Sequence, residues 1–108
     1  MLFRSNSSTG YIGVSLTNNR GQMRLRTTFQ TKNKRLNFGM NDDSPLNRIV
    51  CAIVHDKFVI QAGDEEYAPL NFPILKNEPF KSELIKMDMS EFREESIKHF
   101  IKRLGVEL

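Results

Sequence analysis

Two stretches near the N-terminus alternate strictly between apolar and polar residues. Alternation with a period of two predicts β-strands with two chemically different faces. In residues 22–30 and 35–38, one face would carry Met23, Leu25, Thr27, Phe29, Leu36 and Phe38. The opposite face would carry Arg24, Arg26, Thr28, Arg35 and Asn37. Paired antiparallel, the two runs predict a ribbon with an apolar back and an arginine-rich front.

A third predicted strand precedes this ribbon. Residues 10–16 read as a short strand, and residues 17–21 predict a turn because Asn and Gly tolerate the positive φ angles of tight hairpins. With residues 30–33 as the second connection, three antiparallel strands form a meander. Another element must cover its apolar face.

The candidate cover begins at Ser44, a good N-cap, followed by Pro45 at a first helical position. Helical spacing then relates Leu46, Ile49, Val50, Ile53, Lys57 and Ile60, and Gly63 could close the helix in the left-handed conformation. Residues 49–54 and 58–60 are, however, rich in β-branched side chains, with residues 55–57 as a possible turn. Propensity alone therefore favours two strands here over one helix.

The C-terminal third has one clear element. After an acidic loop at residues 64–66 and an irregular segment at 67–73, residues 74–87 predict an extended connector with a short strand at 84–86. Ser90 can cap a helix over residues 91–104, with Gly105 just past its end. Its apolar face would consist of Phe92, Ile97, Phe100, Ile101 and Leu104. That face can pack on the domain, meet a partner or mediate self-association.

These elements predict an α+β fold, in which a three-stranded antiparallel sheet packs on a helix and a C-terminal helix follows. The chain divides into a flexible N-terminus at residues 1–9, a basic sheet domain at 10–73, and a connector with an amphipathic helix at 74–108. The alternative is a small, mostly-β barrel of five to six strands with a C-terminal helix.

Charge is distributed unevenly along the chain. The first 40 residues hold seven Lys or Arg and no Asp or Glu, whereas the remaining residues hold nine basic and thirteen acidic side chains. Like charges facing one another destabilise a sheet, so a row of arginines on one face suggests an anionic partner. Clustered cations favour nucleic acid because phosphate binding releases counterions. The plainer interpretation is a solvated face in which arginine serves solubility.

Compartment and membrane association follow from composition. The single Cys51 cannot form an internal disulfide and lies in an apolar run, as expected for a reduced, intracellular protein. The first ten residues lack the apolar segment of a secretory signal, and nowhere do 18 apolar residues follow one another. We therefore expect a location in the cytoplasm or nucleoid, and no membrane.

Three motifs resemble a known DNA-binding family. They are Tyr11-Ile12-Gly13-Val14, then Ala52-Ile53-Val54-His55-Asp56-Lys57 before Gly63, and finally Tyr67-Ala68-Pro69-Leu70-Asn71-Phe72-Pro73. In this order they resemble the Apetala-two type domain of plant ethylene-response factors, which also occurs in homing endonucleases of phages and mobile elements. The span of residues 11–73 is about the length of that domain and leaves roughly a third of this chain outside it.

The resemblance implies three antiparallel strands on one helix, with the polar face of the sheet in the DNA major groove. The DNA-facing positions of the family fall on Ile12, Ser15, Arg24, Arg26, Thr28, Arg35 and Asn37. There are departures: Ile12 stands where the plant proteins have arginine, and Met23 replaces a large aromatic residue. About four extra residues also separate Gly39 from the helix. The DNA sequence preference of the plant proteins is therefore not transferable.

Side-chain chemistry divides the candidate residues into two groups. Arg pairs in a bidentate way with guanine, and Asn with adenine, so Arg24, Arg26, Arg35 and Asn37 are candidates for base contact, beside Thr28 on the same face. Arg20, Lys32 and Lys34 lie at the margin and are candidates for phosphate contact.

Catalysis has little support in the sequence. Only two histidines occur, His55 and His99, in different predicted elements, so a histidine-metal nuclease is not indicated. Cys51 lacks a neighbouring activating charge, and no glycine-rich phosphate loop is present. We expect no catalytic residue, no metal and no cofactor.

The predicted function is therefore that of a small, non-enzymatic, nucleic-acid-binding protein for double-stranded DNA, regulatory in role or related to the targeting module of a mobile-element nuclease. One alternative is a phage or mobile-element interaction protein whose basic sheet docks on an acidic host protein. The other is a small barrel for single strands, although the predicted front has no stacking aromatic residue, with Tyr11 the nearest candidate.

Overall fold

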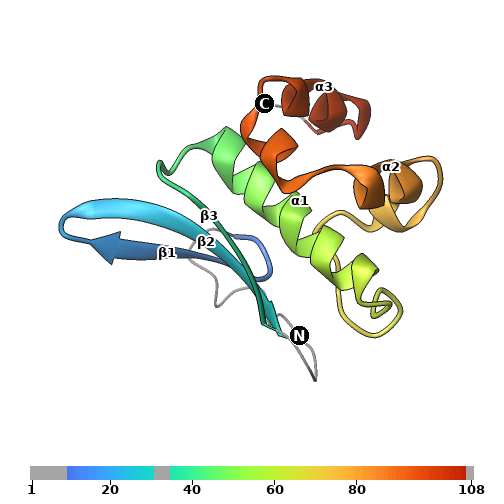
Figure 1. Cartoon of the computed structure of the whole chain (residues 1–108), viewed down its shortest axis with the longest axis horizontal. Coiled ribbons are helices and arrows are strands. Elements are labelled where there is room, and N and C mark those ends of the chain that lie inside the picture. The colour runs from blue at the N-terminus through green and yellow to red at the C-terminus, as the bar shows by residue number, and fades with distance from the viewer. Residues whose placement is uncertain (1–9, 31–34, 107–108) are drawn as a thin grey trace.

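A computed structural model of the chain describes residues 10–30 and 35–106, and it has an α+β fold. Figure 1 shows the central helix α1 (Pro45–Gln61) between a three-stranded antiparallel sheet on one side and the C-terminal helices on the other. The predicted sheet on a helix, followed by a C-terminal helix, is confirmed. The barrel alternative is wrong.

The sheet consists of β1 (Val14–Asn19), β2 (Gln22–Gln30) and β3 (Arg35–Met40), in the order β1-β2-β3. The first strand begins later than predicted, after Gly13 with its positive φ angle, and ends later, because its pairing with β2 continues to Asn19 opposite Gln22. The turn therefore shortens to Arg20 and Gly21, which have φ angles of 55° and 85°. Two residues in this conformation suit the twist of a hairpin.

One helix, α1, covers the sheet. The prediction of two strands over residues 49–60, which propensity favoured, is wrong. Ser44 caps α1 by accepting a hydrogen bond from the Asn47 amide at 3.1 Å, and Pro45 is the first helical residue, as predicted. Gly63 follows the helix with φ 78°, also as predicted. Twelve consecutive residues, 49–60, are buried. A helix enclosed on every side is rich in β-branched residues because packing outweighs their weak helical propensity.

Helical turns form most of the C-terminal segment, which comprises η2 (Pro73–Lys76), α2 (Phe80–Lys86), η3 (Met89–Arg93) and α3 (Ser96–Arg103). The predicted extended connector and the short strand at 84–86 are therefore wrong. The predicted helix over 91–104 is interrupted at residues 94–95.

Asp88, and not Ser90, is the N-cap of η3. The Asp88 and Glu91 side chains form a reciprocal capping box, which satisfies amides that the short helix would leave open. A cap two residues upstream of Ser90 starts the segment earlier than predicted. Gly105 follows α3 with φ 81°, as predicted.

The C-terminal segment shares its core with α1. Its apolar side chains join the same cluster as Val50, Ile53 and Val54, and the members of that cluster from this segment are Leu75, Leu84, Phe92, Ile97, Phe100, Ile101 and Leu104. The predicted apolar face of the last helix is therefore packed within the molecule. Among the described residues, none of the helices is long and apolar enough to cross a membrane.

A buried lysine ties α2 to α1. Lys57 is 3% exposed, and its Nζ donates to the carbonyls of Leu84 and Ile85 at 2.7 and 3.0 Å. These carbonyls belong to the last turn of α2, where a cation is favoured by the helix dipole. Burial nevertheless lowers the pKa of Lys57. Lys57, which helical spacing groups with Ile53 and Ile60, thus links α1 to α2 by hydrogen bonds.

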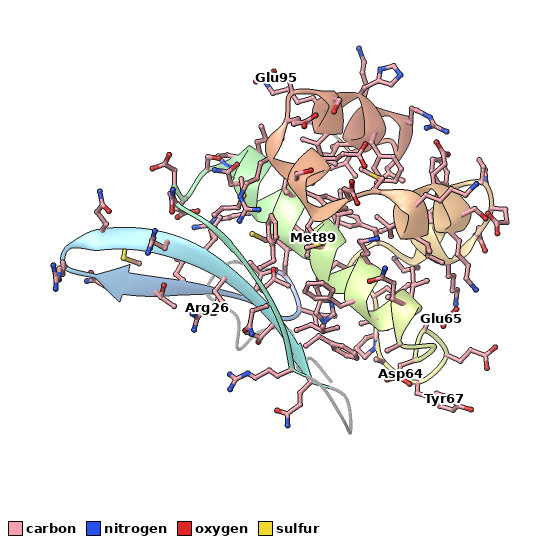
Figure 2. The ribbon with its side chains drawn as sticks, in the orientation of Figure 1. Arg26, Asp64, Glu65, Tyr67, Met89 and Glu95 are labelled. Atoms are coloured by element: carbon pink, nitrogen blue, oxygen red, sulfur yellow. The ribbon has the colours of Figure 1, made fainter. Side chains whose placement is uncertain are left out.

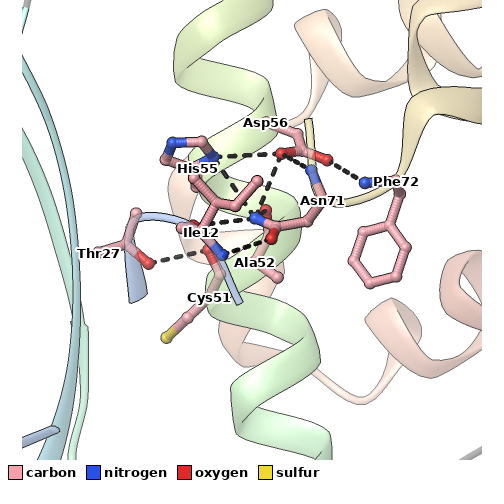
Figure 3. A network of polar contacts seen from close by, with 8 residues as sticks. All are labelled: Ile12, Thr27, Cys51, Ala52, His55, Asp56, Asn71 and Phe72. Atoms are coloured by element: carbon pink, nitrogen blue, oxygen red, sulfur yellow. Dashed lines mark hydrogen bonds and ion pairs between the residues drawn. The ribbon is translucent and has the colours of Figure 1, made fainter. Parts of the chain in front are cut away.

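A polar network joins the start of β1 to the segment after α1 (Figure 3). Asp56, fully buried, accepts hydrogen bonds from the amides of Asn71 and Phe72 at 2.9 and 2.7 Å. The Asn71 side chain in turn accepts a hydrogen bond from the Ile12 amide at 2.6 Å and donates one to the Ile12 carbonyl at 3.0 Å. The network therefore fixes where β1 enters the sheet.

Gly13 lies beside this network and has φ 74°. A Cβ there would overlap the imidazole of His55, lying 2.8 Å from Nε2 and nearer still to Cδ2. Both the left-handed conformation and the close approach of the ring require glycine.

The network predicts a large effect of one substitution. Asp56→Ala leaves two backbone amides without their acceptor, and we expect the free energy of unfolding to fall by about 3 kcal/mol. Urea unfolding followed by circular dichroism measures it. Asp43→Ala is the control, because Asp43 is at the surface, where it forms an ion pair with Arg48. Equal effects of the two substitutions would show that the network does not hold the fold together.

Candidate nucleic-acid interface

The outer face of the sheet carries the predicted arginines. Leu25, which is 1% exposed, faces α1 between Arg24 and Arg26, so those two side chains lie on the opposite side. Thr28 pairs with Asn37, and Gln30 pairs with Arg35, which places these residues on the same outer side. The structure thus brings together the predicted front residues Arg24, Arg26, Thr28, Arg35 and Asn37.

The inner face is not uniformly apolar. Thr27 is fully buried, and its hydroxyl donates to the Cys51 carbonyl of α1 at 2.8 Å, so its polar group is satisfied. Met23, predicted to lie under cover, is 44% exposed because the hairpin extends beyond α1 (Figure 1). The helix therefore supports the part of the sheet around Leu25 and Thr27, and not the hairpin tip.

Arg20 stands in the turn at that tip, where it is exposed. Its left-handed conformation costs an L-residue with a long side chain roughly 1 kcal/mol, and Asn, Asp or Gly would be more favourable there. Turn preference therefore does not explain arginine at this position.

The arginines of the front are not neutralised by carboxylates. Within residues 10–30 and 35–106, no ion pair involves Arg20, Arg24, Arg26 or Arg35. Figure 2 shows Arg26 on the sheet, whereas the labelled acidic residues Asp64, Glu65 and Glu95 lie on the helical side of the molecule. These three acidic residues are therefore not placed to neutralise Arg26.

Sequence reasoning missed one further cation, Arg93. It follows the buried Phe92 in η3, lies with its guanidinium carbon 4.3 Å from the centroid of the Phe38 ring, and donates to the Gly39 carbonyl at 2.6 Å. These contacts hold it against the edge of β3. A Phe-Arg pair 54 residues from the strand it meets gives no sequence signal of this contact.

A cleft of about 440 Å³ opens between these cations. Arg24 and Arg26 line it from β2, Gly39 and Asn41 from β3 and the residue after it, and Arg93 from η3. The Arg24 guanidinium donates to the Asn41 side-chain oxygen at 2.7 Å, which orients it at this site. None of the lining residues is acidic. The cleft is therefore suited to an anion.

Of the remaining predicted positions, the structure describes Ser15 and Ile12. Lys32 and Lys34 lie outside the described residues. Ser15 is exposed and pairs with Arg26 across the strands, so it lies on the outer face as the resemblance implies. Ile12 precedes β1, and its backbone is bonded to Asn71, so it is not part of the strand face.

Cys51 and the two histidines, which the sequence offered as candidates for catalysis, divide between the buried helix α1 and the surface. Burial raises the pKa of the Cys51 thiol to about 11, which keeps it protonated at neutral pH. His55 is buried in α1, whereas His99 is exposed on α3. No group of three His, Cys, Asp or Glu in the described part of the chain could hold a metal ion.

Comparison with protein-family models, with curated proteins and with solved structures finds no match for this chain. The resemblance to the Apetala-two type domain therefore depends on the motif residues and their geometry. Two of those motifs meet in space, since Asp56 accepts the amides of Asn71 and Phe72. Asp56, Asn71 and Phe72 thus connect α1 to the segment after it and do not lie on the outer face of the sheet.

The geometry predicts that the front arginines contribute little to stability. Arg26→Thr retains a β-forming residue at an exposed position, and we expect it to change the free energy of unfolding by less than about 0.5 kcal/mol. Leu25→Ala, on the inner face, should cost about 2 to 5 kcal/mol. Urea unfolding compares the two. A loss for Arg26→Thr as large as that for Leu25→Ala would mean that the arginine is structural.

Proposed function

We propose that the protein binds double-stranded DNA, with the outer face of its sheet in the major groove. The observation that carries the proposal is the position of Arg24, Arg26 and Arg35 on one outer face, without ion pairs among the described residues. The major groove is wide enough for a β-ribbon, and guanidinium groups without carboxylate partners can supply both phosphate affinity and base recognition.

The part of the outer face that α1 supports from behind is suited to recognising DNA bases. Arg26 and Thr28 flank the buried Thr27, so α1 holds this part of β2 firmly while their side chains point outward. Asn37 is directly opposite Thr28, which adds an amide that can pair with adenine. These residues are suited to base edges, whereas Arg20 at the hairpin tip is suited to the phosphate backbone.

Duplex is favoured over single strands by the chemistry of the same face. Single-strand sites combine cations with exposed aromatic rings on which bases stack. The outer-face positions of the three described strands are occupied by Ser, Thr, Arg, Gln, Asn and Gly. The exposed Tyr67 belongs to the loop after α1 and not to the sheet.

The resemblance to the Apetala-two type domain adds support from a different source. A sheet of three antiparallel strands packed on one helix is the architecture that this resemblance implies, and the described chain has that architecture. The proposal extends to a regulatory role or a role in targeting a mobile element, for which that family provides the analogy.

Titration with labelled oligonucleotides tests the proposal. Duplex and single-stranded DNA are compared at several salt concentrations for the natural protein and for a variant with Arg24→Ala, Arg26→Ala and Arg35→Ala. We expect a preference for duplex, and we expect the variant to bind duplex more weakly and with a smaller slope of log affinity against log salt, because each phosphate-neutralising charge that is lost lowers that slope by about 0.9.

The matched control removes three cations from α3 by Lys98→Ala, Lys102→Ala and Arg103→Ala. It changes the net charge equally but leaves the sheet intact, so its duplex affinity should stay close to that of the natural protein. Equal loss in both triple variants would indicate diffuse electrostatic attraction. A folded protein that binds neither form of DNA at low salt would overturn the proposal and favour an acidic protein partner.

A further inference from the structure

The C-terminal segment contributes a cation to the edge of β3, beside the outer face of the sheet. Arg93 belongs to η3, and it reaches β3 by a hydrogen bond to the Gly39 carbonyl and by packing over the Phe38 ring. The capping box of Asp88 and Glu91 fixes the turn that carries it. Arg93 is therefore held in place before any ligand binds, which lowers the entropic cost of using it.

Arg93 keeps donors available for a ligand. A guanidinium group has five N–H donors in a rigid fork, and the bond to Gly39 engages one nitrogen, Nη2. The cleft that Arg93 lines also receives Arg24 and Arg26. Three guanidinium groups around one cleft without an acidic residue repel each other unless an anion lies between them. A phosphate group, which accepts bidentate bonds from arginine, satisfies this arrangement.

Gly39 provides an independent observation. It lies in β3 opposite Arg26, and an added Cβ would meet only the Leu25 carbonyl oxygen, at 3.5 Å, an ordinary contact. Its φ angle is not positive, so neither packing nor conformation requires glycine here. Glycine weakens a strand interior. The absence of a side chain leaves the cleft open between Arg26 and Arg93, which allows a ligand to approach the strand closely.

We propose that this cleft binds one phosphodiester of the DNA backbone, and that Arg93 is a phosphate-binding residue supplied by the C-terminal segment. The inference rests on the proposed function, and it specifies which part of the duplex meets this edge of the sheet. Arg24, oriented by Asn41, then contacts the backbone together with Arg93, while Arg26 lies between the phosphate and the bases.

Duplex titration of four full-length variants tests the inference. Arg93→Met keeps an apolar stem over Phe38 but removes the charge, and we expect roughly tenfold weaker binding and a salt slope smaller by about 0.9. Arg93→Lys retains the charge and therefore the salt slope, and its duplex affinity should lie between those of Arg93→Met and the natural protein. Gly39→Val fills the cleft from a strand position, so it should weaken binding while leaving thermal stability unchanged or higher.

Arg103→Met is the matched control. Arg103 also lies over a phenylalanine ring, with 5.4 Å from its guanidinium carbon to the Phe80 centroid, but it pairs with Glu83 on the helical side. Its loss changes the net charge equally, and we expect duplex affinity within twofold of the natural protein. If Arg93→Met destabilises the fold, Gly39→Val carries the test because it leaves Arg93 in place.

The outcomes separate the two proposals. If Arg93→Met and Gly39→Val bind duplex as the natural protein does, while the triple arginine variant of the sheet does not, the phosphate site is wrong and the DNA-binding function stands. If the natural protein does not bind duplex at all, both are wrong. Weakening by Arg93→Met and Gly39→Val, without an effect of Arg103→Met, supports the site.

Discussion

Burial of α1 on all sides is the constraint on which the rest of the structure depends. Residues 49–60 are buried without interruption, with the sheet on one side and the C-terminal helices on the other. Apolar burial contributes roughly 25 cal/mol per Å², and a helix covered on one side only would lose that contribution on the other. The sheet therefore presents its inner face to a helix that is itself held in place.

The polar groups inside this arrangement act as fixed attachment points. Lys57 bonds to the end of α2, Asp56 to the segment after α1, and the Cys51 carbonyl to Thr27 of β2. Each of these groups has a partner, since no buried side-chain nitrogen or oxygen in the described residues lacks one. Buried polar groups that are fully paired favour one packing arrangement over its alternatives. They attach α2, the segment after α1, and β2 to the same helix.

The sequence predicted the sheet more successfully than its cover. Alternation in β2 and β3 placed Arg24, Arg26, Arg35 and Asn37 correctly on the outer face, because side-chain direction in a strand depends only on position. The identity of residues 49–60 as a helix was ambiguous, because β-branched residues serve a buried helix and a buried strand equally well. The capping signals at Ser44, Pro45 and Gly63 were the correct guide.

Contacts between distant segments could not be predicted. The cleft depends on Arg93 meeting Gly39, and nothing local in the chain indicates that η3 returns to the edge of β3. Met23 is a second example. Alternation assigned it to the inner face but could not show that α1 does not cover it. Local pattern gives the face of a residue, whereas coverage depends on the tertiary fold.

The overhang of the β1–β2 hairpin divides the sheet into parts of different stiffness. Near Thr27 the backbone is clamped by α1, while around Arg20 and Met23 few buried contacts restrain it. Bending of the tip does not disturb the core, so it can occur on the nanosecond to microsecond scale of loops. One rigid end and one compliant end let the hairpin adjust to a curved surface without unfolding.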